Sequence, residues 1–472
     1  MDCGGYCYGA LHPAAETHAS FSWADTVRAA VLDRYSALPQ TGKARDDGSE
    51  WTALAAFLVS VDAASASGRG LLAPRVIALG TGTKCVGASG RCASGTVVHD
   101  CHAEVVARRA LLCYIYEQLA LAATSIDDPD CIFHMLRSDD RVSFSLKPGV
   151  KLHMFCSQPP CGDASLAGPT CRTGAKLLGD VPLDDGTWRE AGGGEQQAGV
   201  TRRKPGRGEP TLSVSCSDKL ARWTSLGVQG ACLMHFLAAP LRIDTLTVAF
   251  PQRAGDTAFS VHDAQQQQQQ QLLEASVRRA VDTRMAALAQ PLAGTMWVPR
   301  PPEVCVVPGP SHKELCVPPS STAGDTEIAP GARGPSACGS SLNWFAGAPS
   351  HPHGGVEVIT GNNGRKAGAT KRTTGDASAA NGGTTKTRSR LCRAALLERF
   401  RSLIVFLHEK AGGDGTESFA LPALHALEIA TYGQVKARAP GGYARARATL
   451  MSPASPLSPW IPKPDGEQDF TT

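Results

Sequence analysis

Apolar residues recur along parts of the chain at the spacing of buried helices. ADTVRAAVLDRYSALP (24–39) has this periodicity, and CHAEVVARRALLCYIYEQLALAA (101–123) has the periodicity of a long, well-buried helix. Asp100 stands just before the second segment and is expected to cap it. SVSCSDKLARWTSLG (213–227) predicts a turn and then a helix, which Ser215 or Ser217 caps and Gly227 ends.

Other apolar runs are short and stop at turn residues, which is typical of strands. RVIALGTGTKCVG (75–87) predicts a strand that runs into a Gly/Thr turn. KLHMFCSQPPCGDASL (151–166) predicts a strand that ends in a Pro-Pro-Cys-Gly turn. EWTALAAFLVSV (50–61) is apolar throughout, so it fits a buried strand or a buried helix equally well.

Several tracts between these elements have the composition of inserts. Residues 185–200 are rich in glycine and acidic residues, and residues 254–271 end in a run of seven glutamines. Residues 300–340 are rich in Pro, Gly, Ser and Ala, and residues 364–388 in Gly, Thr and Lys. Such tracts bury little apolar surface, so we expect loops or disorder there. Residues 1–49 are expected to form a partly flexible N-terminal segment.

Overall composition favours a globular protein inside the cell. Of the 472 residues, 42% are hydrophobic and 19% are charged. The first residues lack the basic and apolar regions of a secretory signal, and no stretch is long and apolar enough to span a membrane. We therefore expect a protein of the cytoplasm or nucleus that is not secreted and does not associate with membranes. Its sixteen cysteines are then reduced thiols, some of them candidate metal ligands.

Charge adds information only locally, because the net charge is +4. Four of the six residues from Arg202 to Arg207 are basic, and residues 432–463 contain five Lys or Arg and no Asp or Glu. Runs of this kind are usually solvated surface, so a specific role for them needs further motifs.

One pair of motifs has the residue types of a catalytic zinc site. Such a site uses three protein ligands and leaves a fourth position open. Zinc deaminases supply them from H-x-E and P-C-x-x-C, and the glutamate moves protons without binding the metal. His102 and Glu104 form the first motif, and Pro160-Cys161 begins the second, but Ala164 replaces its last cysteine.

The third ligand is therefore open from spacing alone. The candidates are Cys156 inside the predicted strand, Cys171 in the loop after it, and Cys216. Cys216 stands at the start of a predicted helix, and a helix N-terminus favours the anionic form of sulfur.

Longer segments resemble a known family and extend this interpretation. CHAEVVARR, PPCGDAS and SCSDKLARWTSLGVQGACL are similar to the adenosine deaminase family that acts on RNA, as are GTGTKC, SRLCR and PWIPKPDGEQDF. The resemblance implies zinc bound by His102, Cys161 and Cys216, with Glu104 as catalytic proton donor and acceptor. It also implies one domain over residues 50–472, interrupted by the inserts. The implied fold is an α/β, cytidine-deaminase-like mixed sheet flanked by helices, enlarged by the C-terminal half of the domain.

The resemblance further implies a buried inositol hexakisphosphate beside the zinc site. Cations could converge in a core only around such a polyanion, because unpaired buried charge is very costly. Asp100 and Lys219 are expected to link the polyanion to the zinc site. The matched positions are Arg108, Arg109, Lys219, Arg222, Trp223, Gln229, Arg393, Tyr432, Lys436, Tyr443, Arg447, Trp460 and Lys463.

The sequence departs from the family's pattern in the C-terminal part of this set. One residue is added between Lys436 and Tyr443, and Pro462 stands where some relatives have an acidic residue. The alternative for these basic residues is a surface that binds RNA phosphates.

Two branches of the family differ in their RNA substrate. Only about fifty residues precede EWTALAAF, too few for a double-stranded RNA-binding module, and CRTGAK and KPGRGE resemble the tRNA branch. The expected substrate is thus the adenosine 3′ to the anticodon of alanine tRNA, at position 37. The alternatives are editing of double-stranded or messenger RNA, and a non-catalytic relative that binds RNA or inositol phosphates. The expected RNA contacts are Thr83, Lys84, Lys204 and Arg207.

Overall fold

A computed structural model gives the fold. It describes residues 22–62, 73–125, 128–138, 141–167, 175–177, 181–182, 188–189, 197–205, 210–250, 263–309, 335–347, 355–368, 387–412, 426–464 and 466–472.

An eight-stranded mixed sheet lies at the centre of the molecule, in the order β15-β14-β8-β2-β3-β17-β18-β19. Strands β8, β14 and β15 run parallel to one another, whereas β2, β3, β17, β18 and β19 each pair antiparallel with their neighbours. The predicted mixed α/β fold is thereby confirmed. The strands are β2 (Leu54–Val61), β3 (Arg75–Thr81), β8 (Val150–Cys156), β14 (Thr245–Phe250), β15 (Glu303–Pro308), β17 (Ser340–Phe345), β18 (Glu357–Thr360) and β19 (Arg365–Lys366).

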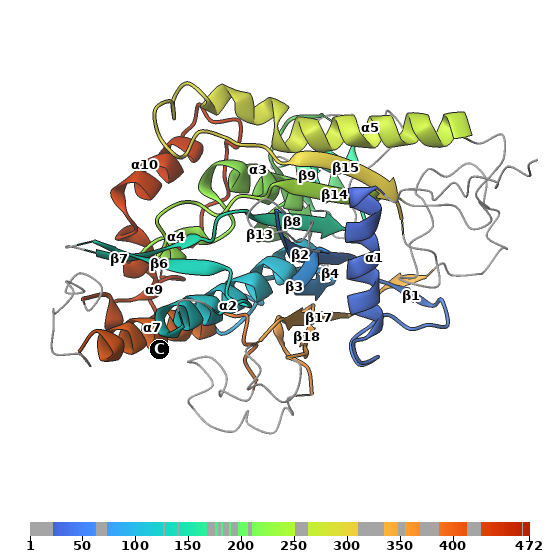
Figure 1. The fold of residues 1–472 in the computed structure, drawn as a ribbon. Helices are drawn as coiled ribbons and strands as arrows, with labels where there is room; N and C mark the ends of the chain where they lie inside the picture. The colour runs from blue at the N-terminus through green and yellow to red at the C-terminus, as the bar shows by residue number, and fades with distance from the viewer. Residues whose placement is uncertain are drawn as a thin grey trace, which may run out of the picture.

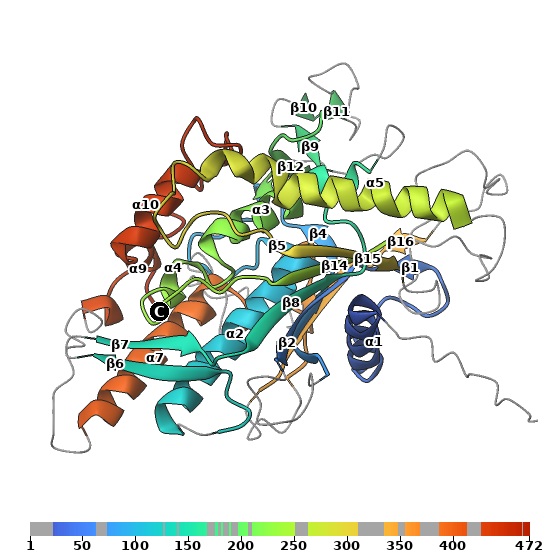
Figure 2. The ribbon, with the colours of Figure 1, turned by 45° about the horizontal axis from the view of Figure 1, so that its top comes forward.

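Strand β2 is buried on both faces of this sheet, because a helix covers each of them. Successive side chains of a strand point to opposite faces. Phe57 packs in the same cluster as helix α2 (Ala103–Thr124), whereas Leu58 packs in the cluster of helix α1 (Trp23–Ser36). Figures 1 and 2 show these two helices on opposite sides of the sheet. A strand buried on both faces has no polar alternation, which is why sequence alone did not separate strand from helix over residues 50–61.

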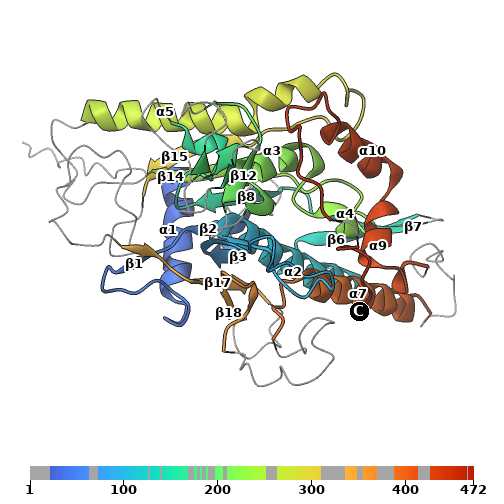
Figure 3. The same ribbon diagram turned by 180° about the vertical axis from the view of Figure 1, so that it is seen from behind.

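The C-terminal third of the chain forms a second helical layer against α2. Helix α7 (Arg393–Gly412) packs along α2, and α9 (Tyr432–Ala437) lies near α7 and α4 (Gly230–Leu233). Helix α10 (Gly441–Leu450) then approaches α3 (Cys216–Leu226). Figure 3 shows this group of helices on one side of the molecule. None of the helices in the described part of the chain is long and apolar enough to cross a membrane.

The described residues also contain short strands and 3-10 helices. The remaining strands are β1 (Glu50–Trp51), β4 (Thr83–Cys85), β5 (Asp100–His102), β6 (Phe133–Ser138), β7 (Arg141–Leu146), β9 (Lys176–Leu177), β10 (Val181–Pro182), β11 (Trp188–Arg189), β12 (Arg202–Pro205), β13 (Pro210–Val214) and β16 (Ser336–Ala337). The 3-10 helices are η1 (Asp163–Ser165) and η2 (Thr283–Leu288).

The glutamine run was predicted to be a disordered insert, and this prediction is wrong. The run belongs to helix α5 (Asp263–Val281). Glutamine forms helices readily, and Leu273, Val277 and Ala280 after the run supply a buried apolar face at helical spacing. The run therefore continues a helix that is anchored at its C-terminal end.

Two further expectations about inserts and boundaries need correction. Residues 300–340 contain β15, which pairs along its whole length with β14 in the central sheet. Residues 22–49 contain α1, whose buried residues pack on the sheet, so this part of the N-terminal segment shares the core of the domain. Strands β11 and β19 fall within the other two tracts, and most of the remaining insert residues lie outside the described ranges.

Substitution of Val31 tests whether α1 is part of the folded domain. Val31 is fully buried in the core between α1 and the sheet. Val31→Ala is expected to lower the free energy of unfolding by about 1–3 kcal/mol, through lost burial and a cavity. Chemical denaturation measures the change, and the exposed Asp33 on the same helix gives a matched control, Asp33→Ala. Equal stability of wild type and Val31→Ala would show that the helix does not dock.

Candidate metal centre and active site

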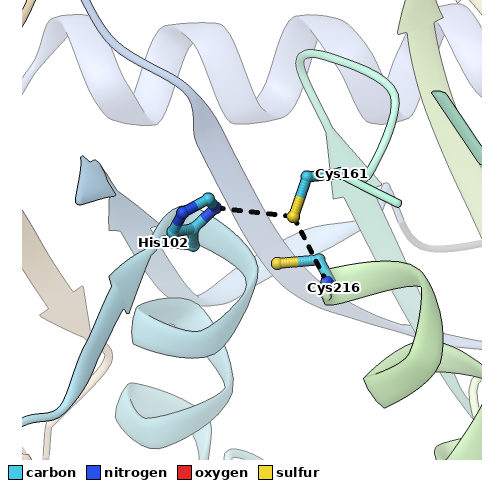
Figure 4. Close-up of side chains that lie close together, drawn as sticks. All are labelled: His102, Cys161 and Cys216. Atoms are coloured by element: carbon cyan, nitrogen blue, oxygen red, sulfur yellow. Dashed lines mark hydrogen bonds between the residues drawn. The ribbon is translucent and has the colours of Figure 1, made fainter. Parts of the chain in front are cut away.

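Three predicted ligands converge from three separate elements. His102 is the last residue of β5, Cys161 lies in the turn after β8, and Cys216 is the first residue of α3. The Cys161 Sγ lies 3.8 Å from His102 Nδ1 and accepts a hydrogen bond from the Cys216 backbone N–H at 3.3 Å. The ligand atoms of all three residues lie within 4.8 Å of one another. Figure 4 shows the three side chains directed toward one another.

The two other candidate cysteines are not part of this group. Cys156 is buried in β8, and its pKa is raised well above the usual value by burial and then by the Glu104 charge, so it stays a neutral thiol. Cys171 lies outside the described residues. Among the described residues the group is thus the one that the resemblance implied.

Local sequence fixes the two cysteine-bearing segments against each other. Gly162 has a φ of +104°, and a Cβ at this position would lie 2.3 Å from the Ser215 Oγ. Only glycine allows the turn to approach α3 so closely. The Ser217 hydroxyl lies 3.0 Å from the carbonyl oxygens of Pro160 and of Cys161. The predicted caps of α3 are confirmed, since the Ser215 side chain accepts from the Asp218 N–H and Gly227 ends the helix.

His102, rather than Asp100, occupies the N-cap position of α2. The Asp100 carboxylate accepts a hydrogen bond from the His102 backbone N–H at 3.0 Å and does not cap the helix. The predicted capping role is therefore wrong. Asp100 belongs to β5, which pairs with β4, and this pairing aims the carboxylate at buried lysines instead.

Lys204 is completely buried and contacts the metal group directly. Its Nζ lies 3.0 Å from the Cys216 Sγ and 3.0 Å from the Asp100 Oδ1. The prediction that Lys204 binds RNA is wrong, because no part of its side chain reaches the surface. Strand alternation could have predicted that Lys204 is buried, since Arg202 and Lys204 alternate with more exposed residues along β12.

The buried charges around the two thiols shift one another's pKa. Burial lowers the pKa of Lys204, but Asp100 and then the thiols outweigh it, so the pKa lies well above the usual value. The pKa of Asp100 lies well below its usual value, because Lys204 and Lys219 outweigh burial. A hydrogen bond with Cys216 lowers the pKa of Cys161, and Lys204 lowers it further, against burial. One thiolate is thus favoured before a metal binds.

Glu104 lies in the first turn of α2, two residues beyond His102, and is 7% exposed. Its charge acts on Cys216 and on Lys204, which shows that the carboxylate faces the same interior region. The site therefore combines three candidate metal ligands with one acidic group outside that set.

The donor set fits zinc. Thiolate sulfur and imidazole nitrogen are the ligands that zinc prefers, and three protein ligands leave a fourth position for water or substrate. The short distances among His102, Cys161 and Cys216 allow one small ion to contact all three. The nearby Lys204 ammonium also offsets part of the negative charge of two thiolates.

A cavity of about 420 Å³ lies beside this group, on the other side of α3 and Asp100. Its wall includes all the residues predicted to bind a polyanion, among them eight cationic side chains, with Asp100 as the carboxylate of the lining. The cationic residues are Arg108, Arg109, Lys219, Arg222, Arg393, Lys436, Arg447 and Lys463.

The cations in the cavity wall crowd one another. The pKa of Arg108 falls to about 9 through burial and then through Arg222 and Arg109. The pKa of Lys436 falls to about 8 through burial and then through Arg447. The indole N–H of Trp223 is also buried there without a hydrogen-bond acceptor. An anion with many oxygens would satisfy these groups together.

A chain of ion pairs connects the cavity to the metal group. Lys219, which lines the cavity, donates to Asp100, and Asp100 in turn binds Lys204. Lys204 then donates to the Cys216 Sγ. Asp100 and Lys219 thus connect the cavity wall to the metal group, as predicted. Lys204 is also part of this connection, although the sequence predicted that it binds RNA.

The added residue in the C-terminal part leaves the cavity wall intact. Residues 438–440 connect α9 to α10. Lys436 on α9 and Tyr443 on α10 both face the cavity, and Pro462 also lines it. Lys463 lies at the exposed rim, where its Nζ donates to the Leu212 carbonyl at 3.3 Å.

Besides Lys204, the predicted RNA contacts Thr83 and Lys84 lie on the strand that pairs with the His102 strand. Thr83 in β4 pairs with His102 in β5, and the Thr83 hydroxyl is buried without a hydrogen-bond partner. Lys84 is the neighbouring, half-exposed residue. Arg207 lies outside the described residues.

The chain matches a known domain over most of its length. The profile of the Adenosine-deaminase (editase) domain matches residues 78–464. The chain is 32% identical over 295 residues to the "tRNA-specific adenosine deaminase 1" of Drosophila melanogaster, covering 59% of the chain and 63% of that protein. It is 26% identical over 560 residues to the protein of that name in Macaca fascicularis, covering 95% of the chain and 99% of that protein.

Similarity extends to editing enzymes with other names. The chain is 33% identical over 201 residues to the "Double-stranded RNA-specific editase B2" of Mus musculus, covering 39% of the chain and 26% of that protein. The matches to the Drosophila and mouse tRNA deaminases span less than two thirds of those proteins, 63% and 62%. Since the domain profile matches far more than half of the residues, the chain belongs to the Adenosine-deaminase (editase) domain family.

Proposed function

We propose that this protein deaminates adenosine to inosine in tRNA by zinc-dependent hydrolysis. The observation that carries the proposal is the convergence of His102, Cys161 and Cys216, with the buried Glu104 beside them. The family and the tRNA-specific names of two relatives support the reaction and the substrate class. The proposed target is the adenosine 3′ to the anticodon of alanine tRNA, at position 37.

Glu104 moves the protons of the proposed reaction. His102, Cys161 and Cys216 would hold zinc, which would supply a water of lowered pKa as the nucleophile near neutral pH. Glu104 accepts a proton as water adds to C6 of adenine and delivers it to N1. It then takes the proton of the new C6 hydroxyl and passes it to the amino group, so that the C6–N bond breaks, ammonia leaves and the C6 carbonyl of inosine remains.

The neighbouring ion pairs hold the ligands ready for this chemistry. Lys204 contacts the Cys216 sulfur and stabilises its anionic form, because their Nζ–Sγ distance is 3.0 Å in a dry environment. Asp100 keeps Lys204 charged and in place. Outer groups of this kind orient a metal's ligands, and their loss typically costs about 10- to 100-fold in metal affinity or activity.

The substrate base must leave its stack to reach such a site. An anticodon loop already presents unpaired bases, so no inserted wedge is needed to extrude the target. We propose that Thr83 contacts the sugar of the target nucleotide, since its hydroxyl is buried beside His102 without a partner. Lys84 is placed to contact the adjoining phosphate.

We also propose that the cavity holds inositol hexakisphosphate. The excess of cationic side chains in its wall, the lowered pKa of Lys436 and the unpaired Trp223 indole support a buried polyanion. The alternative, in which these residues bind RNA phosphates at the surface, is less favoured because most of them line an interior cavity.

The replacement Glu104→Gln tests the proton-transfer role. The variant is expected to retain zinc and fold but to lose roughly 10²- to 10⁴-fold in kcat, since an amide cannot move the protons. Metal analysis measures the zinc content, and inosine quantification measures kcat. Glu117 on the same helix pairs with Arg399, so Glu117→Gln is the matched control and should keep full activity. An active Glu104→Gln enzyme would rule out the mechanism.

The choice of RNA is tested with two substrates. Purified protein is incubated with an alanine tRNA transcript and with a perfect RNA duplex, and inosine is read as guanosine after reverse transcription. We expect conversion at position 37 of the tRNA alone. Conversion of the duplex alone would favour a double-stranded RNA editor. No conversion of either by the zinc-loaded protein would favour a non-catalytic binder.

The proposed polyanion should stabilise the protein in a pH-dependent way. Burial and then Arg447 lower the pKa of Lys436 to about 8, against an ordinary value of 10.5, so the unfolded chain binds more protons between these values. Stability of the ligand-free protein then rises with pH across this window, whereas a bound polyanion keeps Lys436 protonated and removes the rise.

The gain in Tm on adding inositol hexakisphosphate should therefore be larger at about pH 7 than at about pH 9.5. Thermal unfolding with and without inositol hexakisphosphate measures this gain in Tm, and the Lys436→Met variant serves as the comparison. A gain that is equal at both pH values, or absent, contradicts the proposal.

A further inference from the structure

Helix α5 carries an arginine that binds the segment of Cys161. The Arg279 Nε lies 3.1 Å from the Asp163 Oδ1, and its Nη2 donates to the Asp163 carbonyl at 2.9 Å and to the Leu166 carbonyl at 3.2 Å. Asp163 stands two residues after Cys161, and its side chain is fully buried. The arginine therefore holds both the side chain and the backbone of the turn that presents the first sulfur.

A second arginine, in η2 just after α5, binds the segment of Cys216. The Arg284 Nη1 lies 2.8 Å from the Asp218 Oδ1, and both residues are buried. Asp218 stands two residues after Cys216. Its other oxygen accepts from the Ser215 hydroxyl at 2.6 Å, so Asp218 is held on both sides. The two arginine–aspartate pairs occupy equivalent positions relative to the two sulfurs.

Both aspartates also bind one further segment. The Gly199 N–H donates to the Asp163 Oδ1 at 2.8 Å, and the Arg202 N–H donates to the Asp218 Oδ2 at 3.0 Å. This segment continues directly to Lys204, which contacts the Cys216 sulfur. Helix α5 packs against α3 and β15, and Figure 2 shows it beside them. Helix α5 and the adjoining η2 thus hold the turn that follows each sulfur, and the two aspartates of these turns also bind the segment that leads to Lys204.

One small ion can contact both sulfurs only if their spacing is held, and the ligand atoms of the group lie within 4.8 Å of one another. Direct contacts through Ser217 supply part of this constraint. The two arginines add a second constraint. Each pairs with an aspartate whose carboxylate is buried and cannot turn toward water.

We propose that Arg279 and Arg284 are positioning residues of the metal centre, which fix the distance between Cys161 and Cys216 and so slow the loss of zinc. The inference rests on the metal-binding part of the proposed function. It assigns a specific task to α5, a helix that contributes no ligand.

The test measures zinc release from the full-length, zinc-loaded protein to a chromogenic chelator, with Arg279→Gln as the main variant. Arg279 is 30% exposed, so this variant should fold. Release is expected to be roughly 10- to 100-fold faster than in wild type. The neighbouring Arg278 is 45% exposed and pairs with Glu274, so Arg278→Gln is the matched control and should release zinc at the wild-type rate.

A stabilising role alone would give another pattern. Circular dichroism establishes a temperature at which every variant is fully folded, and release is compared there. Arg284→Lys, which keeps the buried charge, should release zinc between the wild-type and Arg279→Gln rates. A lowered Tm with a wild-type release rate in Arg279→Gln and Arg284→Lys would overturn the proposal.

The outcome is separable from that of the proposed reaction. If wild type holds zinc, Arg279→Gln releases it fast, and neither edits RNA, then the positioning role stands and the deaminase assignment fails. If wild type edits tRNA and Arg279→Gln holds zinc as firmly as wild type, then the positioning role fails alone.

Discussion

The buried ammonium group of Lys204 is the interaction on which the rest of the site depends. It has no access to water, so its charge must be balanced inside the protein, and Asp100 and the Cys216 sulfur are the groups that balance it. Asp100 in turn requires Lys219, which faces the cavity. Lys204, Asp100 and Lys219 thus join the Cys216 sulfur to the cationic cavity. Because the interior has a low dielectric constant, a change of charge in the cavity alters the electrostatic potential at the sulfur, and the reverse also holds.

The central sheet gives these charges a fixed frame. Strand β8 delivers Cys161, the β4–β5 pair delivers His102, and α3 delivers Cys216 at its N-terminus. Each element packs on a sheet that is buried on both faces, so the ligands come from segments far apart in sequence and close together in space. The lining of the cavity also comes from segments far apart in sequence. Helices α2 and α3 contribute some of its residues, and α7, α9 and α10 contribute others.

The sequence alone predicted the helices and strands that have a clear hydrophobic periodicity or capping residues, such as α3 between Ser215 and Gly227. It also identified the ligand types, but spacing left three cysteines open, and only the resemblance and then the geometry selected Cys216. Lys204 was misassigned because a basic tract usually means surface, whereas strand alternation turned this one residue inward. Arg279 and Arg284 carried no signal, since nothing in a one-dimensional pattern relates a helix near residue 280 to turns at 163 and 218.

The placement of the glutamine run in α5 has a consequence for variation in repeat length. Several of these glutamines are exposed, and the run precedes Leu273, whose side chain is buried. A longer or shorter run changes the part of α5 before Leu273, including Gln270, whose side chain donates to the Val306 carbonyl at 3.1 Å. Burial downstream sets the register from Leu273 to Arg279, so we expect a change in repeat number to leave the contact to Asp163 in place.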